Sequence, residues 1–310
     1  PFYWYTYEEE QGKPAYAKTE EALKWCEEHH VTAKGHTLLW EFKYGKPKWL
    51  SGKQADETTQ KARVEDLMGR YKGRIGYWEV VNEPVNQPGL SLMPAYGWAR
   101  SADPAAKLGV NEYGILYIGH YKFLELMEQS VKQNVPFDFV GIQGHAPTTE
   151  AFPLDRVWAV LDQYAGLKKE LHITEFSPGS NGAKVTGATW RKIWTEDQQA
   201  DYAVKFYRAC FAHPAVEAIT WWDLADNPNN FVENGGLLHL DMTPKPAYLA
   251  IKKLLNETWH TKLTVKTDAQ GQVKVRGFYG DYTVSAGAKK GGFTLTKGKE
   301  GPLGVTLGGK

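Results

Sequence analysis

Cysteine is scarce in this sequence, which holds only Cys26 and Cys210 among 310 residues. So small a number excludes a disulfide scaffold and leaves too few thiolates for a cysteine-based zinc site. Both residues lie in segments with a helical pattern. We therefore interpret each as a small buried apolar residue rather than as half of a disulfide.

Net charge is also close to zero, because 37 Lys and Arg residues face 36 Asp and Glu residues. Nucleic acid as the main partner would require a strong cationic field, so this balance argues against it. The chain lacks an apolar run of about 18 residues, so we expect no membrane span. It also shows no signal peptide at Pro1, which we take to mean that any such segment was removed or omitted.

Aromatic residues are abundant, with 12 Trp and 17 Tyr. Most should fill the core. Some are candidates for stacking against sugar rings, whose C–H faces are apolar and whose edges are polar. The length suits one barrel of about 250 residues with a small appendage.

Short apolar runs alternate with amphipathic segments along most of the chain. The runs that we interpret as buried strands are residues 31–40, 75–83, 107–111, 139–144, 171–175 and 216–222. The segments between them place apolar residues at helical spacing. Strands and helices that alternate at this size predict parallel βαβ units.

The pattern supplies six strands, or seven if residues 2–5 are the end of another. A closed (β/α)₈ barrel needs eight. We therefore predict an α/β fold over residues 1–258, a TIM barrel that lacks its first β/α unit.

The pattern changes after a last predicted helix at residues 245–255. From residue 261 to residue 310 the helical period disappears, and short β-type runs are interrupted by Gly, Asp and Lys. These runs are residues 263–266, 273–278, 282–285 and 293–296. We predict a small β module, and we favour a stabilising appendage over a carbohydrate-binding module because few stacking aromatics are present.

Candidate reacting groups should lie at the C-terminal ends of the strands, as in other (β/α)₈ barrels. These ends carry His36, Trp40, Asn82, Glu83, Asn111, Gln143, His145, Glu175 and Trp222. Glu83 and Glu175 form the central pair. Cleavage of a glycosidic bond needs one protonated carboxyl and one ionised carboxylate, about 5–5.5 Å apart in retaining enzymes. The alternative is that either Glu is only a salt-bridged residue at a strand end.

Six segments, taken in order, resemble the motifs of glycoside hydrolase family 10, the family of endo-β-1,4-xylanases. They are residues 35–40 (GHTLLW), 78–84 (WEVVNEP), 102–107 with 111–113 (ADPAAK and NEY), 141–145 (GIQGH), 173–175 (ITE) and 222–226 (WDLAD). The resemblance covers residues 1 to about 258, and the C-terminal module lies outside it.

The resemblance implies a role for each matching position. Glu83 corresponds to the general acid/base and Glu175 to the nucleophile. Asn82 corresponds to the residue that bonds the sugar 2-hydroxyl. Gln143 corresponds to a polar residue beside the acid/base, and His145 to a partner of the nucleophile. Such neighbours keep one carboxyl protonated and the other ionised.

The same resemblance implies a −1 sugar site and a reaction. His36 and Trp40 match the floor of this site, and Trp222 matches an aromatic platform under the sugar. The implied protein is an extracellular or periplasmic, retaining endo-β-1,4-glycanase. Its partner is a polysaccharide, xylan first, and it uses no cofactor and no metal. The pattern leaves the oligomeric state open.

The sequence departs from the family pattern at three positions. Glu41 stands where the family has His. Either it is a third acid near Glu175, or the loop at residues 41–48 turns it away, which we favour. Tyr3 stands where a Lys for the −2 sugar is expected, and Phe231 stands in for a second Trp. These changes alter the predicted −2 subsite, so they affect the choice of xylan as substrate and not the type of reaction.

Two alternatives stay open at this point. One is a non-catalytic glycan-binding barrel, which the missing β/α unit, Glu41 and Tyr3 favour. Retention of Glu83, Glu175 and Asn82 argues against it, because binding alone needs no poised carboxylates. The other alternative is a glycosidase for a different β-glycan.

Overall fold

The computed structural model describes residues 2–43, 45–50, 53–118, 121–145, 151–186, 192–298 and 301–308. Contacts between Cα atoms divide the chain into two compact units, Pro1–Ala247 and Tyr248–Lys310. The sequence-based division into residues 1–258 and 261–310 remains a prediction.

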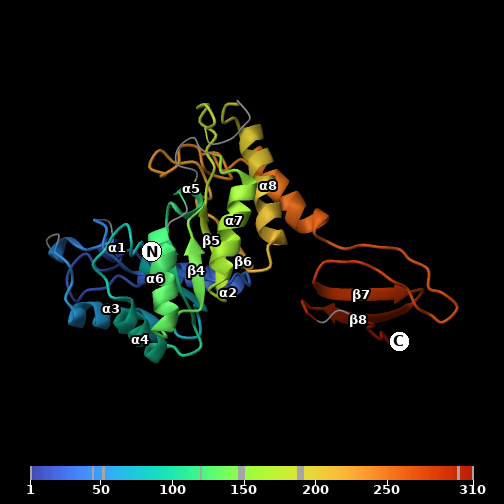
Figure 1. The fold of residues 1–310 in the computed structure, drawn as a ribbon, viewed down its shortest axis with the longest axis horizontal. Coiled ribbons are helices and arrows are strands. Elements are labelled where there is room, and N and C mark those ends of the chain that lie inside the picture. The colour runs from blue at the N-terminus through green and yellow to red at the C-terminus, as the bar shows by residue number, and fades with distance from the viewer. Residues whose placement is uncertain are drawn as a thin grey trace. The chain divides into compact units, whose positions relative to one another are not determined.

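A six-stranded parallel sheet forms the centre of the first unit (Figure 1). The strands follow each other in chain order, which confirms the predicted βαβ pattern. They are β1 (Lys34–Trp40), β2 (Tyr77–Asn82), β3 (Lys107–Glu112), β4 (Phe139–Ile142), β5 (Glu170–Phe176) and β6 (Val216–Trp221). All four residues of β4 are buried, as expected for a parallel sheet that is covered on both faces.

The proposal of a strand end at residues 2–5 is wrong. Trp4–Tyr7 form the short helix α1, with Tyr3 at its N-cap position. Trp4 and Tyr7 are three residues apart and are both buried, which is helical rather than alternating spacing. The described chain therefore supplies six strands of a barrel that needs eight, and the sheet is a partial barrel.

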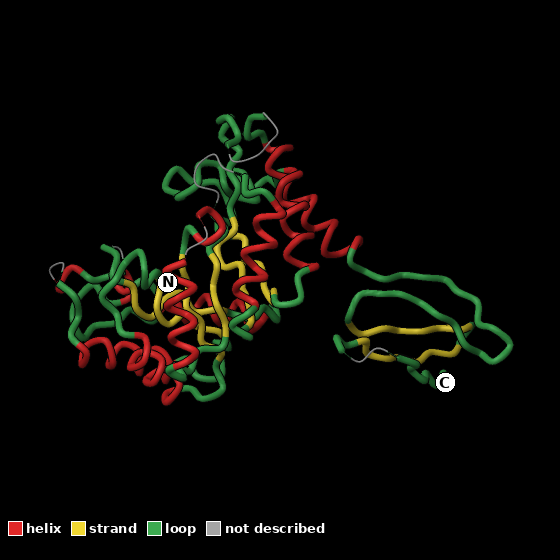
Figure 2. The backbone as a smooth tube through the Cα atoms, in the orientation of Figure 1, coloured by secondary structure: helices red, strands yellow, loops and turns green. Residues whose placement is uncertain are grey.

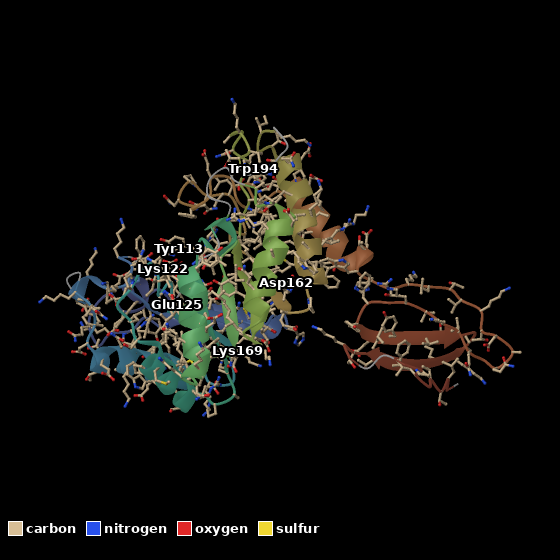
Figure 3. All side chains as sticks on the ribbon, in the orientation of Figure 1. Tyr113, Lys122, Glu125, Asp162, Lys169 and Trp194 are labelled. Atoms are coloured by element: carbon tan, nitrogen blue, oxygen red, sulfur yellow. The ribbon has the colours of Figure 1, made fainter. Side chains whose placement is uncertain are left out.

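Helices connect the strands and pack against them (Figures 1 and 2). Contacts join α3 to β1, α4 to β2 and β3, α7 to β5, and α8 to β6. The longer helices of this unit are α2 (Ala17–Glu28), α3 (Glu57–Arg70), α4 (Leu92–Ala102), α6 (Tyr121–Lys132), α7 (Leu154–Ala165) and α8 (Glu196–Ala212). Two shorter elements are the 3₁₀ helix η1 (Lys48–Leu50) and the α-helix α5 (Ile115–Ile118).

Side chains at the start and along one face define these helices. Asp56 caps α3 by accepting a hydrogen bond from the Thr59 N–H, and Thr195 caps α8 in the same way through Gln198. The apolar stripe of α3 is fully buried at Val64, Leu67 and Met68, and the C-cap residue Tyr71 continues it. Burial of such a stripe supplies most of the stability of a helix of this length.

The boundary between the units falls inside α9 (Pro246–Lys253). The second unit continues with η2 (Leu254–Thr258) and contains an antiparallel hairpin of β7 (Gly280–Ala286) and β8 (Lys289–Leu295). Two of the four predicted β runs, 282–285 and 293–296, coincide with these strands in whole or in part. The runs at 263–266 and 273–278 are not strands, so those predictions are wrong. Stacked rings of Tyr282 and Phe293, 4.8 Å apart, join the two strands.

Helices long and apolar enough to cross a bilayer do not occur among the described residues.

Candidate active site

Glu83 and Glu175 lie at the C-terminal edge of the sheet, where the yellow strands of Figure 2 give way to loops. Glu83 follows the last residue of β2 directly, and Glu175 is the last but one residue of β5. Both are nearly buried, with exposed fractions of 7% and 4%. A carboxyl that is removed from water in this way needs partners inside the protein.

One buried amide connects the two halves of the site. The Asn111 Nδ2 group donates to Glu175 Oε1 and to Asn82 Oδ1, each at 2.8 Å. Its Oδ1 accepts a hydrogen bond from the Thr174 hydroxyl at 2.6 Å. Gly141 leaves room for this network, because a Cβ atom there would lie 2.6 Å from Asn111 Oδ1. Asn111 therefore joins residues from β2, β3 and β5.

Glu83 has two neutral donors. Gln143 Nε2 donates to its Oε1 at 2.9 Å, and Trp40 Nε1 donates to its Oε2 at 2.8 Å. Burial is the largest influence and raises the pKa of Glu83, the two hydrogen bonds oppose it, and the negative charges of Glu175 and Glu112 add to the rise. Glu83 therefore retains its proton to a higher pH than an ordinary carboxyl, as a general acid requires.

Glu175 is held by a histidine instead. His145 Nε2 lies 2.7 Å from Glu175 Oε2, and His145 Nδ1 lies 2.5 Å from the Ser177 hydroxyl. The backbones of His145 and Ser177 also form an isolated parallel β-bridge, which keeps the two residues beside each other. Together with Asn111, this gives each oxygen of Glu175 one hydrogen bond. A carboxylate with both oxygens so oriented suits a nucleophile.

An ion pair that the sequence did not predict lies in β1 and β2. Glu79 is 2% exposed, and its Oε2 lies 2.5 Å from His36 Nδ1, with Lys34 Nζ 3.6 Å from its Oε1. Burial opposes charge on both partners. Even so, His36 and Lys34 lower the pKa of Glu79, and Glu79 raises the pKa of His36. The sequence signal that could have predicted this ion pair is an acidic residue, Glu79, inside an otherwise apolar strand.

Aromatic rings surround these groups. The Trp222 ring meets the rings of His36 and His145 edge-on, at centroid distances of 5.2 Å and 5.9 Å. Phe231 is 70% exposed, and its ring lies 5.2 Å from that of His145. Trp222 therefore contacts two histidines of the site, and the exposed Phe231 contacts one of them.

Tyr3 reaches the same place from the N-terminal segment. Its ring lies 5.7 Å from the rings of both His36 and Trp40. Burial raises the pKa of its hydroxyl, and the charges of Glu175 and Glu83 add to the shift. The hydroxyl is thus a neutral donor close to both carboxyl groups.

Glu41 is the predicted site residue that pairs elsewhere. Its Oε2 lies 2.9 Å from Lys46 Nζ, and both side chains are nearly buried. Its charge is balanced within its own loop, as expected if the loop turns Glu41 away from Glu175.

A further acidic residue, Asp223, follows Trp222. Its Oδ2 is buried and has no hydrogen-bond partner among the described residues. Burial raises its pKa and His145 opposes the rise, whereas Asp226 and Glu175 add to it. Asp223 was not among the predicted site residues, since the resemblance assigns it no role.

One trio of potential metal ligands occurs in the part of the chain that the structure describes. Ligand atoms of His36, Glu79 and Glu175 lie within 4.8 Å of one another. Each already has a partner inside the protein, since His36 bonds Glu79 and Glu175 bonds His145. These contacts account for the trio as part of the carboxyl network.

Comparison with known proteins gives one family and consistent relatives. The family model described as "Glycosyl hydrolase family 10" matches residues 2–254. Endo-1,4-beta-xylanase B of Thermotoga neapolitana is 28% identical over 283 residues, which cover 82% of this chain and 78% of that protein. Endo-1,4-beta-xylanase 2 of Arabidopsis thaliana is 27% identical over 300 residues, which cover 91% of this chain but only 26% of that longer protein.

Solved structures agree on the fold. The crystal structure of native xylanase 10B from Thermotoga maritima superposes with a TM-score of 0.68 and 24% sequence identity. The match covers 82% of this chain and 84% of that one.

Proposed function

Because the chain belongs to glycosyl hydrolase family 10, we propose that it cleaves internal β-1,4 bonds of xylan with retention of configuration. The observation that carries the proposal is the unequal environment of two buried glutamates. Glu83 has neutral donors and a raised pKa, whereas Glu175 has a histidine and an amide. Two carboxyl groups kept in different protonation states are what a double displacement needs.

In the first step, a Glu175 oxygen attacks the anomeric carbon of the −1 sugar. The bond from that carbon to the glycosidic oxygen breaks, and Glu83 gives its proton to the departing oxygen. A glycosyl ester on Glu175 remains. In the second step, Glu83 takes a proton from water, the water oxygen bonds to the anomeric carbon, and the ester bond to Glu175 breaks.

The neighbouring side chains orient these two carboxyl groups. Gln143 and Trp40 direct the oxygens of Glu83, and Asn111 and His145 direct those of Glu175. Positioning of reacting groups removes much of the entropic barrier to such a reaction.

The sugar at −1 would contact the residues between the two glutamates. We place Asn82 at the sugar 2-hydroxyl, with His36 and Trp40 on the floor and Trp222 as the platform. Tyr3 and Phe231 extend the site toward −2, where a neutral phenol replaces the expected lysine.

Xylan is the first choice of substrate because the relatives are endo-1,4-beta-xylanases and the similar xylanase 10B from Thermotoga petrophila was solved in complex with xylobiose. Such a polymer is too large to enter a cell, so an extracellular or periplasmic location follows from the proposal. A panel of β-glycans tests the choice of xylan separately from the reaction.

Glu175→Gln tests the reaction. The substitution keeps the size of the side chain but removes the nucleophile, so release of reducing ends from xylan should fall below detection. Glu170→Gln is the matched control, because Glu170 begins the same strand and its side chain pairs with Lys107 and approaches His172 at the other end of the sheet. It should retain wild-type turnover.

Unchanged turnover of Glu175→Gln would contradict the proposal. Binding of xylan by the wild type without any product would favour the glycan-binding alternative.

A further inference from the structure

Glu112, the last residue of β3, is a fully buried acid that the mechanism above does not use. Its side chain accepts hydrogen bonds from the segment that follows Glu83. Oε2 accepts from the Val85 N–H at 2.9 Å, and Oε1 accepts from the Asn86 side-chain amide at 2.8 Å. The N–H groups of Tyr113 and Asn86 add contacts at 2.9 Å and 3.3 Å.

Burial raises the pKa of Glu112, and these donors oppose that rise. A buried carboxylate without partners is strongly destabilising, whereas several N–H groups can replace its water shell. Three of the donors are backbone groups, which cannot rotate away. The carboxylate therefore fixes the path of the chain at residues 84–86.

The path matters because Glu83 has an unusual backbone conformation. Its φ angle is +57°, in the left-handed region that non-glycine residues seldom adopt. Such a conformation persists only where the surroundings hold it. On one side the Glu83 N–H donates to the Asn111 carbonyl at 2.7 Å, and on the other the chain is held by Glu112.

Glu112 also acts on Glu83 by a second route. Its carbonyl accepts a hydrogen bond from the Gln143 N–H at 3.0 Å. The Gln143 side chain in turn donates to Glu83 Oε1. One residue thus anchors both the turn that follows Glu83 and the residue that orients the Glu83 carboxyl.

We propose that Glu112 is a positioning residue, which holds the turn after Glu83 so that the Glu83 carboxyl points at the glycosidic oxygen. The inference rests on the proposed function. Glu112 touches no reacting atom, and it acts through Glu83 alone.

The charge of Glu112 has a consequence of its own. Two charged groups act on the pKa of Glu83, namely Glu175 on β5 and Glu112 on β3. The charge of Glu83 in turn acts on the pKa values of Tyr113 after β3, Tyr3 before α1 and His36 on β1. Burial and Glu175 raise the pKa of Glu83, and Glu112 raises it as well. Removal of the Glu112 charge should therefore lower that pKa.

Glu112→Gln tests the proposal with two substrates. Xylan has a poor leaving group that needs the proton of Glu83, whereas 2,4-dinitrophenyl β-xylobioside does not. A misplaced general acid should reduce kcat/KM on xylan by about tenfold to a hundredfold and change the aryl glycoside by less than about threefold. The alkaline limb of the pH profile on xylan should move to lower pH.

Asp138→Asn is the matched control. Asp138 also accepts a backbone hydrogen bond from β3, from the Leu108 N–H at 2.8 Å, but at the opposite end of that strand from Glu112. Loss of its charge should leave the ratio of the two activities and the pH profile as in the wild type.

Asn86→Ala is a milder second variant in case Glu112→Gln does not fold. It removes one donor to Glu112 and should change the activity ratio in the same direction by a smaller factor. Equal losses on both substrates by folded variants, with an unmoved alkaline limb, would overturn the role of Glu112. Failure of the wild type to cleave either substrate would instead overturn the proposed function.

Discussion

At the scale of single residues, neighbouring side chains place chemically identical carboxyl groups in different electrostatic environments. Glu83 has an amide and an indole, Glu175 has an amide and an imidazole, and Glu79 has a histidine and a lysine. The pKa of Glu83 is raised and that of Glu79 is lowered, although burial pushes both upward. The partner and not the depth therefore decides the charge.

The Glu79–His36 pair predicts a pH window of stability. The raised pKa of His36 stabilises the fold fully below its ordinary value of 6.5, and this is lost as pH rises through the folded pKa. The lowered pKa of Glu79 stabilises the fold above its ordinary value of 4.5, and this is lost as pH falls through the folded pKa. Between pH 4.5 and pH 6.5, both groups therefore contribute their full stabilisation to the fold.

Glu79→Gln should therefore lower the free energy of unfolding by about 2 kcal/mol at pH 5.5, since it removes a hydrogen bond between charged groups. The difference from the wild type should shrink at high pH, where His36 loses its proton. Urea unfolding at several pH values measures it. A difference that does not vary with pH would contradict the role given to the ion pair.

The sequence predicts Glu83 and Glu175 together with their partners Gln143 and His145, but it assigns no role to Glu79, Glu112 or Ser177. Glu79 and Glu112 lie inside the matched segments and Ser177 just after one, but their contacts join segments that are distant in sequence, so the local pattern does not reveal what they do. Asn111 was named only as a polar residue at a strand end. Its hydrogen bonds to two other strands depend on the sheet register, which the sequence does not specify.

At the scale of elements, a buried lysine holds together the loops that follow β5 and β6. Lys245 has no exposed surface, and its Nζ lies 3.2 Å from both carboxylate oxygens of Asp226. It also lies 2.9 Å from the Ser180 hydroxyl and from the Asn234 carbonyl. Asp226 in turn accepts the Gly236 N–H. The loop that begins with Trp222 is therefore tied to the one that follows Glu175.

Lys245→Met should leave Asp226 without its buried counter-charge. Breaking such a pair from one side lowers the free energy of unfolding by about 3–5 kcal/mol, which urea unfolding would detect. The double variant Lys245→Met/Asp226→Leu removes both charges and should recover part of the loss. A single variant as stable as the wild type would show that the pair contributes nothing to these loops.

The parallel strands were predictable because most are short runs of largely apolar residues that are buried on both faces, as in β2, β4 and β5, whereas the residues of the edge strand β6 are only partly buried. The failures have a common cause. Residues 2–5, 263–266 and 273–278 are rich in aromatic or β-branched residues, but no neighbouring strand pairs with them in the described structure. Strand propensity depends on such a neighbour, and composition alone does not supply it.

At the scale of the whole molecule, the chain consists of two units with different degrees of burial. The first contains every residue assigned to the site, from Tyr3 to Phe231. In the second, residues 261–279 run outside regular strands and are almost all exposed. Four basic residues lie in this exposed stretch, at Lys262, Lys266, Lys274 and Arg276.

Brief treatment with trypsin should therefore cut first at these four residues, because proteases need an extended and accessible backbone. The fragment that retains Glu83 and Glu175 should keep wild-type activity on xylan. Mass spectrometry identifies the cuts, and a reducing-sugar assay follows the activity. Loss of activity in step with release of the C-terminal segment would assign it a part in catalysis.

The Asn111 amide fixes which end of Asn82 is free to meet a ligand. Because Asn82 presents its oxygen to Asn111, its own NH₂ group is the end left for recognition. An NH₂ group of this kind can only donate hydrogen bonds, so the ligand atom that it contacts must be an acceptor with a lone pair. A sugar with fluorine at the 2-position keeps that lone pair, whereas a 2-deoxy sugar lacks it. The two analogues should therefore bind with different affinities.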